Sequence, residues 1–69
     1  MAHLNTISHH ITVTSEATGK RRFVKVTGNK VHGYIGEVHA GGHQIGITYN
    51  CYPFPEAAQT EAIRVANAI

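Results

Sequence analysis

Two adjacent glycines, Gly41 and Gly42, separate two runs of strand-like sequence and constrain this chain more than any other feature. The run before them covers residues 31–40, and the run after them covers residues 43–51. A Gly-Gly pair suits a two-residue type I′ turn, because both central residues of that turn need a positive φ. The two runs are therefore predicted to form an antiparallel hairpin.

A two-residue turn also sets the register of the hairpin, and residues opposite each other share a face of the sheet. One face is predicted to carry the apolar side chains Tyr34, Val38, Ile45, Ile47 and Tyr49. The other face is predicted to carry Ile35, Glu37, His39, Gln44 and Thr48. Gly36 and Gly46 are expected on opposite faces, where a strand glycine marks a bulge, a bend or a close approach to the backbone.

Two further strands are predicted before the hairpin. Residues 5–14 alternate β-branched and polar side chains with a period of two, which is typical of a half-buried strand. Residues 21–27 form a second β-rich run, and the turn signal at 28–30 follows it. If Val24 and Val26 of this run face the core, then the odd-numbered side chains Phe23, Lys25 and Thr27 point outward.

The end of the chain predicts a helix over about residues 55–68. Neither Pro53 nor Pro55 can continue a central strand, and Pro55 suits the first turn of a helix. An apolar stripe follows at helical spacing: Ala58, Ala62, Val65, Ala66 and Ile69. Phe54 is expected to pack beneath the start of this helix.

Together these elements predict a single α+β domain, residues 1–69, in which one C-terminal helix packs on one face of an antiparallel β-meander. The meander is four-stranded, or three-stranded if the first run does not pair. A chain of this length buries only about 60% of its unfolded surface, and its single cysteine, Cys51, allows no internal disulfide. Self-association is one way to supplement such a small core, so a homodimer is expected.

Composition favours a small soluble protein of the cytoplasm. No run approaches the roughly 18 apolar residues of a membrane span. The N-terminus lacks the basic start and apolar stretch of a signal peptide. Only 14% of residues are charged, so Thr, Ser, Asn, Gln, His and Gly are expected to supply most of the surface.

The cations are concentrated rather than spread along the chain. Five of the six Lys and Arg residues lie within eleven positions, and they are Lys20, Arg21, Arg22, Lys25 and Lys30. Phe23 lies among them, so the segment resembles a surface on which a base stacks while cations contact phosphates. These six residues are the candidate nucleic-acid site, and a partner face extends from them over Ile35, His39, Gln44 and Thr48.

Six histidines make metal binding an alternative, since histidine is the commonest transition-metal ligand. The predicted register places His32 opposite Cys51, with His9 as a third ligand from the first strand. The spacing does not match a structural zinc site, and polar surface roles explain the histidines as well, so neither a metal nor a cofactor is expected. Catalysis is not expected either, because the chain has four Glu, no Asp and no motif around Cys51.

The order of elements over about residues 20–69 resembles that of the transcriptional-coactivator and Whirly single-strand DNA binders, which dimerise. Three strands and a helix also resemble integrase arm-binding domains and a class of plant DNA-binding domains. The resemblance implies nucleic-acid binding, although the order of elements alone does not establish a function. The first hypothesis is thus a non-enzymatic nucleic-acid-binding protein. The second is a small inhibitor or adaptor, of the kind phages and mobile elements encode, that binds a protein target. The third is a His-rich metal-binding protein.

Overall fold

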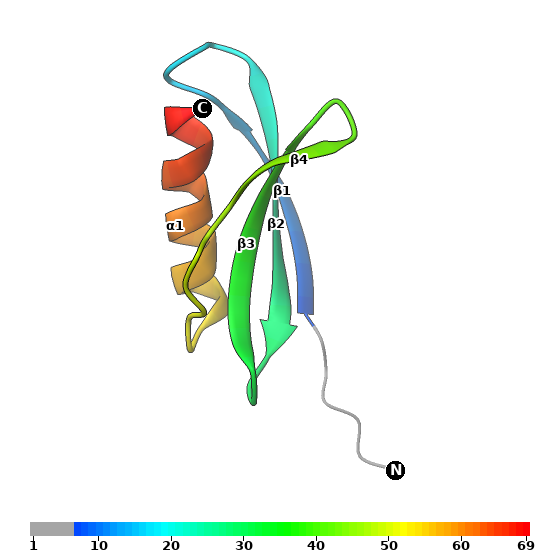
Figure 1. Cartoon of the computed structure of the whole chain (residues 1–69), viewed down its shortest axis with the longest axis vertical. Coiled ribbons are helices and arrows are strands. Elements are labelled where there is room, and N and C mark those ends of the chain that lie inside the picture. Colours follow the sequence, from blue (N-terminus) through cyan, green and yellow to red (C-terminus); the bar gives the residue numbers. More distant parts are fainter. Residues whose placement is uncertain (1–6) are drawn as a thin grey trace.

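The computed structural model describes residues 7–69, with side chains from His10 onward, as one antiparallel sheet with a helix against one face (Figure 1). The elements in chain order are β1 (Ile7–Thr14), β2 (Arg21–Asn29), β3 (Gly33–Ala40), β4 (His43–Ile47) and α1 (Pro55–Ala68). The strands lie side by side in the order β1-β2-β3-β4, so the predicted four-stranded α+β meander is confirmed. Residues 5 and 6 of the predicted first strand lie outside the described residues.

The predicted Gly-Gly turn is confirmed. Gly41 and Gly42 have φ values of 59° and 80°, which only glycine adopts without strain. Ala40 pairs with His43 directly across them, so the loop contains these two residues and no others. The hairpin thus begins in the predicted register.

That register fails one pair later, because Ile45 is a β-bulge. His39 pairs with Gln44, but Val38 pairs with Gly46, so Ile45 has no opposite residue. An extra residue in one strand reverses the facing of every side chain beyond it. The prediction that Ile45, Ile47 and Tyr49 line the helix side is therefore wrong.

The residues beyond the bulge show the reversal. Ile47 lies opposite Glu37, on the face that α1 does not cover, and Tyr49 is 95% exposed in the bend after β4. Thr48, which was predicted on the uncovered face, is instead buried on the helix side. Its hydroxyl accepts the Gly36 N–H at 3.0 Å, and its N–H donates to the Gly36 carbonyl at 2.8 Å. β4 itself ends at Ile47 rather than at residue 51.

Two glycines in the hairpin let α1 lie close to the sheet. A Cβ on Gly36 would stand 2.5 Å from the Cβ of Ala62, and a Cβ on Gly46 would stand 2.9 Å from Ile69 Cδ1. Both glycines thus face the helix, so the expectation that they lie on opposite faces is wrong. The bulge at Ile45 is what brings Gly46 to the helix side.

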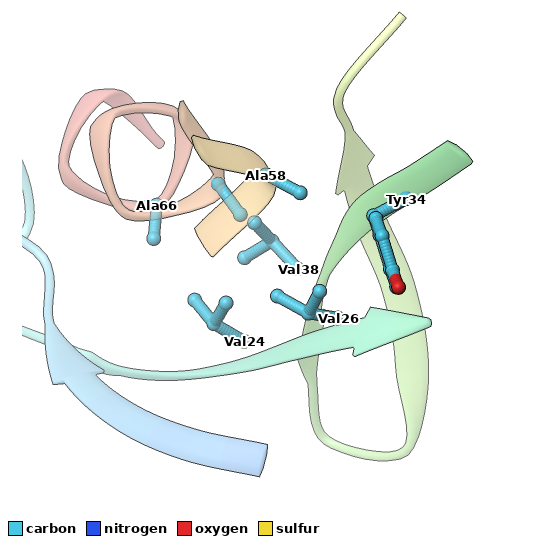
Figure 2. Packing of buried hydrophobic residues seen from close by; sticks show 7 residues of the cluster. Val24, Val26, Tyr34, Val38, Ala58 and Ala66 are labelled. Atoms are coloured by element: carbon cyan, nitrogen blue, oxygen red, sulfur yellow. The ribbon is translucent and has the colours of Figure 1, made fainter. Parts of the chain in front are cut away.

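The core lies between α1 and the middle of the sheet (Figure 2). Its buried hydrophobic residues are Val24, Val26, Tyr34, Val38, Ala58, Ala62 and Ala66. The partly buried residues packed around them are Ile11, Val13, Tyr52, Val65 and Ile69. The predicted helical stripe is confirmed, and small alanines explain how one helix covers the sheet closely. Phe54 is 64% exposed, so its predicted place beneath α1 is wrong.

The two ends of α1 are completed by different parts of the chain. Pro55 occupies the first turn and Glu56 places negative charge there, as the helix dipole favours. The last turn has no basic residue of its own, but Arg22 Nη2 of β2 donates to the Ile69 carbonyl at 2.8 Å. The loop between β1 and β2 also contacts this end, since the Ala17 N–H donates to the Asn67 carbonyl at 3.1 Å (Figure 1). Within residues 7–69 no helix is long and apolar enough to cross a membrane.

Candidate nucleic-acid interface

The sheet face turned away from α1, called here the open face, carries the aromatic and basic residues of β2. Val24 and Val26 point to the core and are almost fully buried. The odd-numbered side chains therefore alternate to the open face, where Phe23 is 47% exposed. Arg21, Phe23 and Lys25 form a row along one strand, called here the β2 row.

Neighbouring strands place polar side chains beside the β2 row. Phe23 lies between Thr12 of β1 and His39 of β3 in the register. In the next row His10 of β1 and Glu37 of β3 flank Lys25. Opposite residues in an antiparallel sheet lie about 5 Å apart at their Cβ atoms, so these groups share one continuous surface.

An open groove of about 310 Å³ lies on this surface. Its lining residues are His10, Phe23, Lys25, His39 and Gly42. The groove combines an aromatic ring, an ammonium group and two imidazoles, which suits a ligand with a flat ring and a negative charge.

Arg22 is the predicted site residue that the structure separates from the others. It follows Arg21 in sequence, but even-numbered positions of β2 face α1. Its guanidinium reaches the helix end, and its Nε is buried without a hydrogen-bond partner among the described residues. Arg22 thus connects β2 to α1 and adds no charge to the open face.

The remaining cations of the predicted patch lie at the two ends of β2. Lys20 precedes the strand and Lys30 follows it, in the turn that leads to β3. Both side chains are exposed, one beyond each end of the strand. Within β2, the alternation places two cations, Arg21 and Lys25, on the open face.

Of the four residues of the predicted partner face, Ile35, His39 and Gln44 lie on the open face and Thr48 does not. Ile35 and His39 alternate with buried residues of β3, and Gln44 pairs with His39. The His39 Nε2–H donates to Glu37 Oε1 at 2.8 Å, so the carboxylate on the open face is engaged by its neighbour. Ile47 joins this face, and the sequence did not indicate it because the bulge was not foreseen.

Arg64 does not add to the basic surface. It lies on α1, and its Nε donates to both carboxylate oxygens of Glu61, each at 3.0 Å. This hydrogen bond lowers the pKa of Glu61 and raises the pKa of Arg64. The charge of Arg64 is thus compensated locally, on the layer opposite the β2 row.

The metal alternative has little geometric support in the described part of the chain. Tyr34 pairs with Tyr52, so His32 does not lie opposite Cys51 as predicted. The side chain of His9, the third suggested ligand, lies outside the described residues. Within those residues no group of three or more His, Cys, Asp or Glu side chains is placed to hold a metal ion.

The fold and the open face together define a small α+β domain with one covered and one uncovered sheet face. No known protein family, no curated protein and no solved structure matches the chain.

Proposed function

We propose that this protein binds single-stranded nucleic acid without catalysing a reaction on it. The observation that carries the proposal is the β2 row, in which an exposed aromatic ring lies between two cations on a sheet face that no other element of residues 7–69 covers. The groove beside the row gives a base room to enter.

Phe23 supports the choice of single strands over duplexes. An aromatic side chain can stack on a base only where the base is not already stacked and paired, and each such contact contributes about 1–3 kcal/mol. Phe23 is 47% exposed and lines the open groove, so part of its ring is accessible to a base. His39 and Thr12 flank the ring and offer hydrogen bonds to a base edge.

Arg21 and Lys25 support phosphate contact. They are four residues apart on one strand, so about 13 Å separates them, with Phe23 midway between them. This spacing lets an extended strand place phosphates at both cations while a base stacks on the ring. Lys20 and Lys30 lengthen the path at either end.

Fluorescence anisotropy with a labelled 12-nucleotide DNA or RNA strand tests the proposal. Phe23→Ala is expected to weaken binding by roughly 5- to 150-fold through lost stacking. Lys25→Ala is expected to weaken binding, because one fewer phosphate is neutralised. The slope of log affinity against log salt concentration is expected to become shallower by about 0.7.

Arg64→Ala is the matched control, since it removes the same charge from the layer opposite the open face. Its affinity is expected to stay within about 2-fold of the unmodified protein at equal salt. Affinity that does not change between low and high salt would reject the proposal. An equal loss in Arg64→Ala and Lys25→Ala would also reject the β2 row as the site.

A protein target is the second candidate, and the apolar half of the open face favours it. Ile35 and Ile47 lie on β3 and β4 beside Glu37, and Ile45 is exposed at the bulge. An apolar patch rimmed by polar groups is typical of protein interfaces. Binding to such a target would survive high salt, and an Ile35→Lys substitution would weaken it more than Lys25→Ala would.

A further inference from the structure

We propose that the free edge of β1 pairs with β1 of a second copy of this chain, which makes one continuous eight-stranded sheet. β1 is at the end of the strand order β1-β2-β3-β4, so within residues 7–69 it has a neighbour on one side only. The inference concerns assembly and does not depend on the proposed nucleic-acid binding.

The two edges of the sheet differ in how well they are protected from pairing. β4 has five residues and a bulge at Ile45, and short or bulged edges resist addition of another strand. β1 has eight residues, ISHHITVT, with no Lys, Arg, Asp, Glu or Pro, and its ladder to β2 is regular. β1 therefore lacks the charged residues, prolines and bulges that usually prevent an edge strand from pairing with another chain.

The hydrogen-bond pattern shows which main-chain groups of β1 point outward. The Ser15 N–H donates to the Lys20 carbonyl at 2.8 Å, in the register that continues along β1 and β2. Bonded and non-bonded pairs alternate in an antiparallel ladder, so odd-numbered β1 residues bond to β2. Even-numbered residues, including Thr12 and Thr14, direct their main-chain groups away from the sheet.

A second copy is the occupant that fits this edge. Antiparallel pairing of a strand with itself is isologous, and a two-fold axis perpendicular to the sheet keeps both open faces on one side. The absence of charge in β1 means that two copies do not repel each other. Pairing centred on Ile11 uses nearly the whole strand and forms about eight hydrogen bonds.

The helix side of β1 gives an independent reason for pairing. α1 lies mainly over β2 and β3, and Ile11 and Val13 of β1 are only partly buried against the core. In the paired arrangement the second copy's Ile11 lies directly beside Ile11, in the space between the two helices. Apolar surface that one small domain leaves partly exposed is thus covered.

The pairing would also enlarge the binding surface. The two β2 rows would lie three strand spacings apart, about 14 Å, on the same face. The two β2 rows would run in opposite directions. Two nucleic-acid strands, or one nucleic-acid strand that folds back on itself, could therefore occupy both rows. A monomer offers only one row.

Thr12→Pro tests the pairing with little effect on the monomer. The Thr12 N–H points outward, so proline removes a donor for the second copy and no bond to β2. Mass in solution is measured without nucleic acid from about 5 to 500 µM, because a small interface is expected to be weak. The unmodified protein and the Thr12→Val control are expected to reach twice the 7.5 kDa of one chain, and Thr12→Pro is expected to stay at 7.5 kDa with unchanged circular dichroism.

Cysteine cross-linking tests the register and remains informative if Thr12→Pro does not fold. In a Cys51→Ser background, Ile11→Cys is expected to form a disulfide-linked dimer on mild oxidation, since opposite Cβ atoms approach within about 5 Å. Val13→Cys, on the same face and also partly buried, is the control and is expected to stay largely monomeric because two copies of Val13 lie about 13 Å apart. A monomer at every concentration, or a dimer that Thr12→Pro does not alter, would overturn the proposal. Nucleic-acid binding by such a monomer would leave the proposed function standing.

Discussion

Single residues decide how closely the two layers of this protein approach each other. Gly36 lies beneath α1 and donates its N–H to the hydroxyl of Thr48 on the helix side. Because glycine has no side chain, Ala62 of α1 can lie directly against it. The sequence shows the glycines and the alanine stripe, but it does not show that they meet. Arg22 is a similar case, since only its position relative to α1 separates it from its neighbour Arg21.

Gly36→Ala is expected to destabilise the protein by about 1–3 kcal/mol, because the added Cβ would overlap Ala62 and the Ala58 carbonyl in a closely packed layer. Urea unfolding measures the change. Ala62→Gly, which removes the clashing methyl, is expected to cost less in the Gly36→Ala background than in the unmodified protein. Additive effects of the two substitutions would show that the contact is not the cause.

At the scale of elements, the bulge in β4 has the largest consequence for the candidate site. It moves Ile47 to the open face and Thr48 to the core, and it places Gly46 under the end of α1. Hydrophobic alternation in β4 favours a regular hairpin with Ile45 and Ile47 buried, and this prediction is wrong. A regular hairpin would place Ile45 opposite Val38, in the position that Gly46 occupies. A side chain at this position would overlap Val65 and Ile69 of the helix segment, so the bulged register is favoured.

Deletion of Ile45 is expected to leave the fold intact, with a loss of less than about 1.5 kcal/mol, because the remaining residues can pair regularly and the deleted side chain is 42% exposed. Thermal unfolding followed by circular dichroism measures the effect. Insertion of one alanine after Gly46 is the comparison, and it is expected to be far more disruptive because it moves Thr48 away from Gly36. Equal damage from the two changes would contradict the assigned register.

At the scale of the whole molecule, the buried core formed by the described side chains is small: it has three valines, three alanines and one tyrosine. Such a core is small, so any assembly that covers the partly exposed edge of β1 adds noticeably to stability. The proposed nucleic-acid binding uses the other face of the same sheet. Stability and binding are thus assigned to different surfaces of one layer.

The melting temperature is expected to rise with protein concentration if β1 edges pair, because association favours the folded state. Above the dissociation constant, a tenfold increase in concentration is expected to raise the melting temperature by about 3–5 °C. Differential scanning calorimetry over two decades of concentration measures the shift. Thr12→Pro is expected to show a concentration-independent value, and a flat profile for the unmodified protein would argue against the pairing.

Much of the fold could be predicted from local sequence. The Gly41-Gly42 turn and the alternation of β2 follow from backbone preferences and from side chains two residues apart, and so does the helix that begins at Pro55. Phe23 and Lys25 were placed on the open face for the same reason, since a period of two requires no knowledge of distant residues. The end of β4 could not be predicted from local sequence. Its register depends on contact between Gly46 and the distant residues Val65 and Ile69.

The sequence by itself determined the element order, the Gly-Gly hairpin, the helical alanine stripe and the concentration of cations around β2. The tertiary structure alone decided that Arg22 binds the end of α1, that Thr48 is buried, and that β4 bulges at Ile45. The physical reason is that the first set depends on local backbone geometry and periodicity. The second set depends on steric contact between β4 and α1 and on the reach of Arg22 to the far end of the helix.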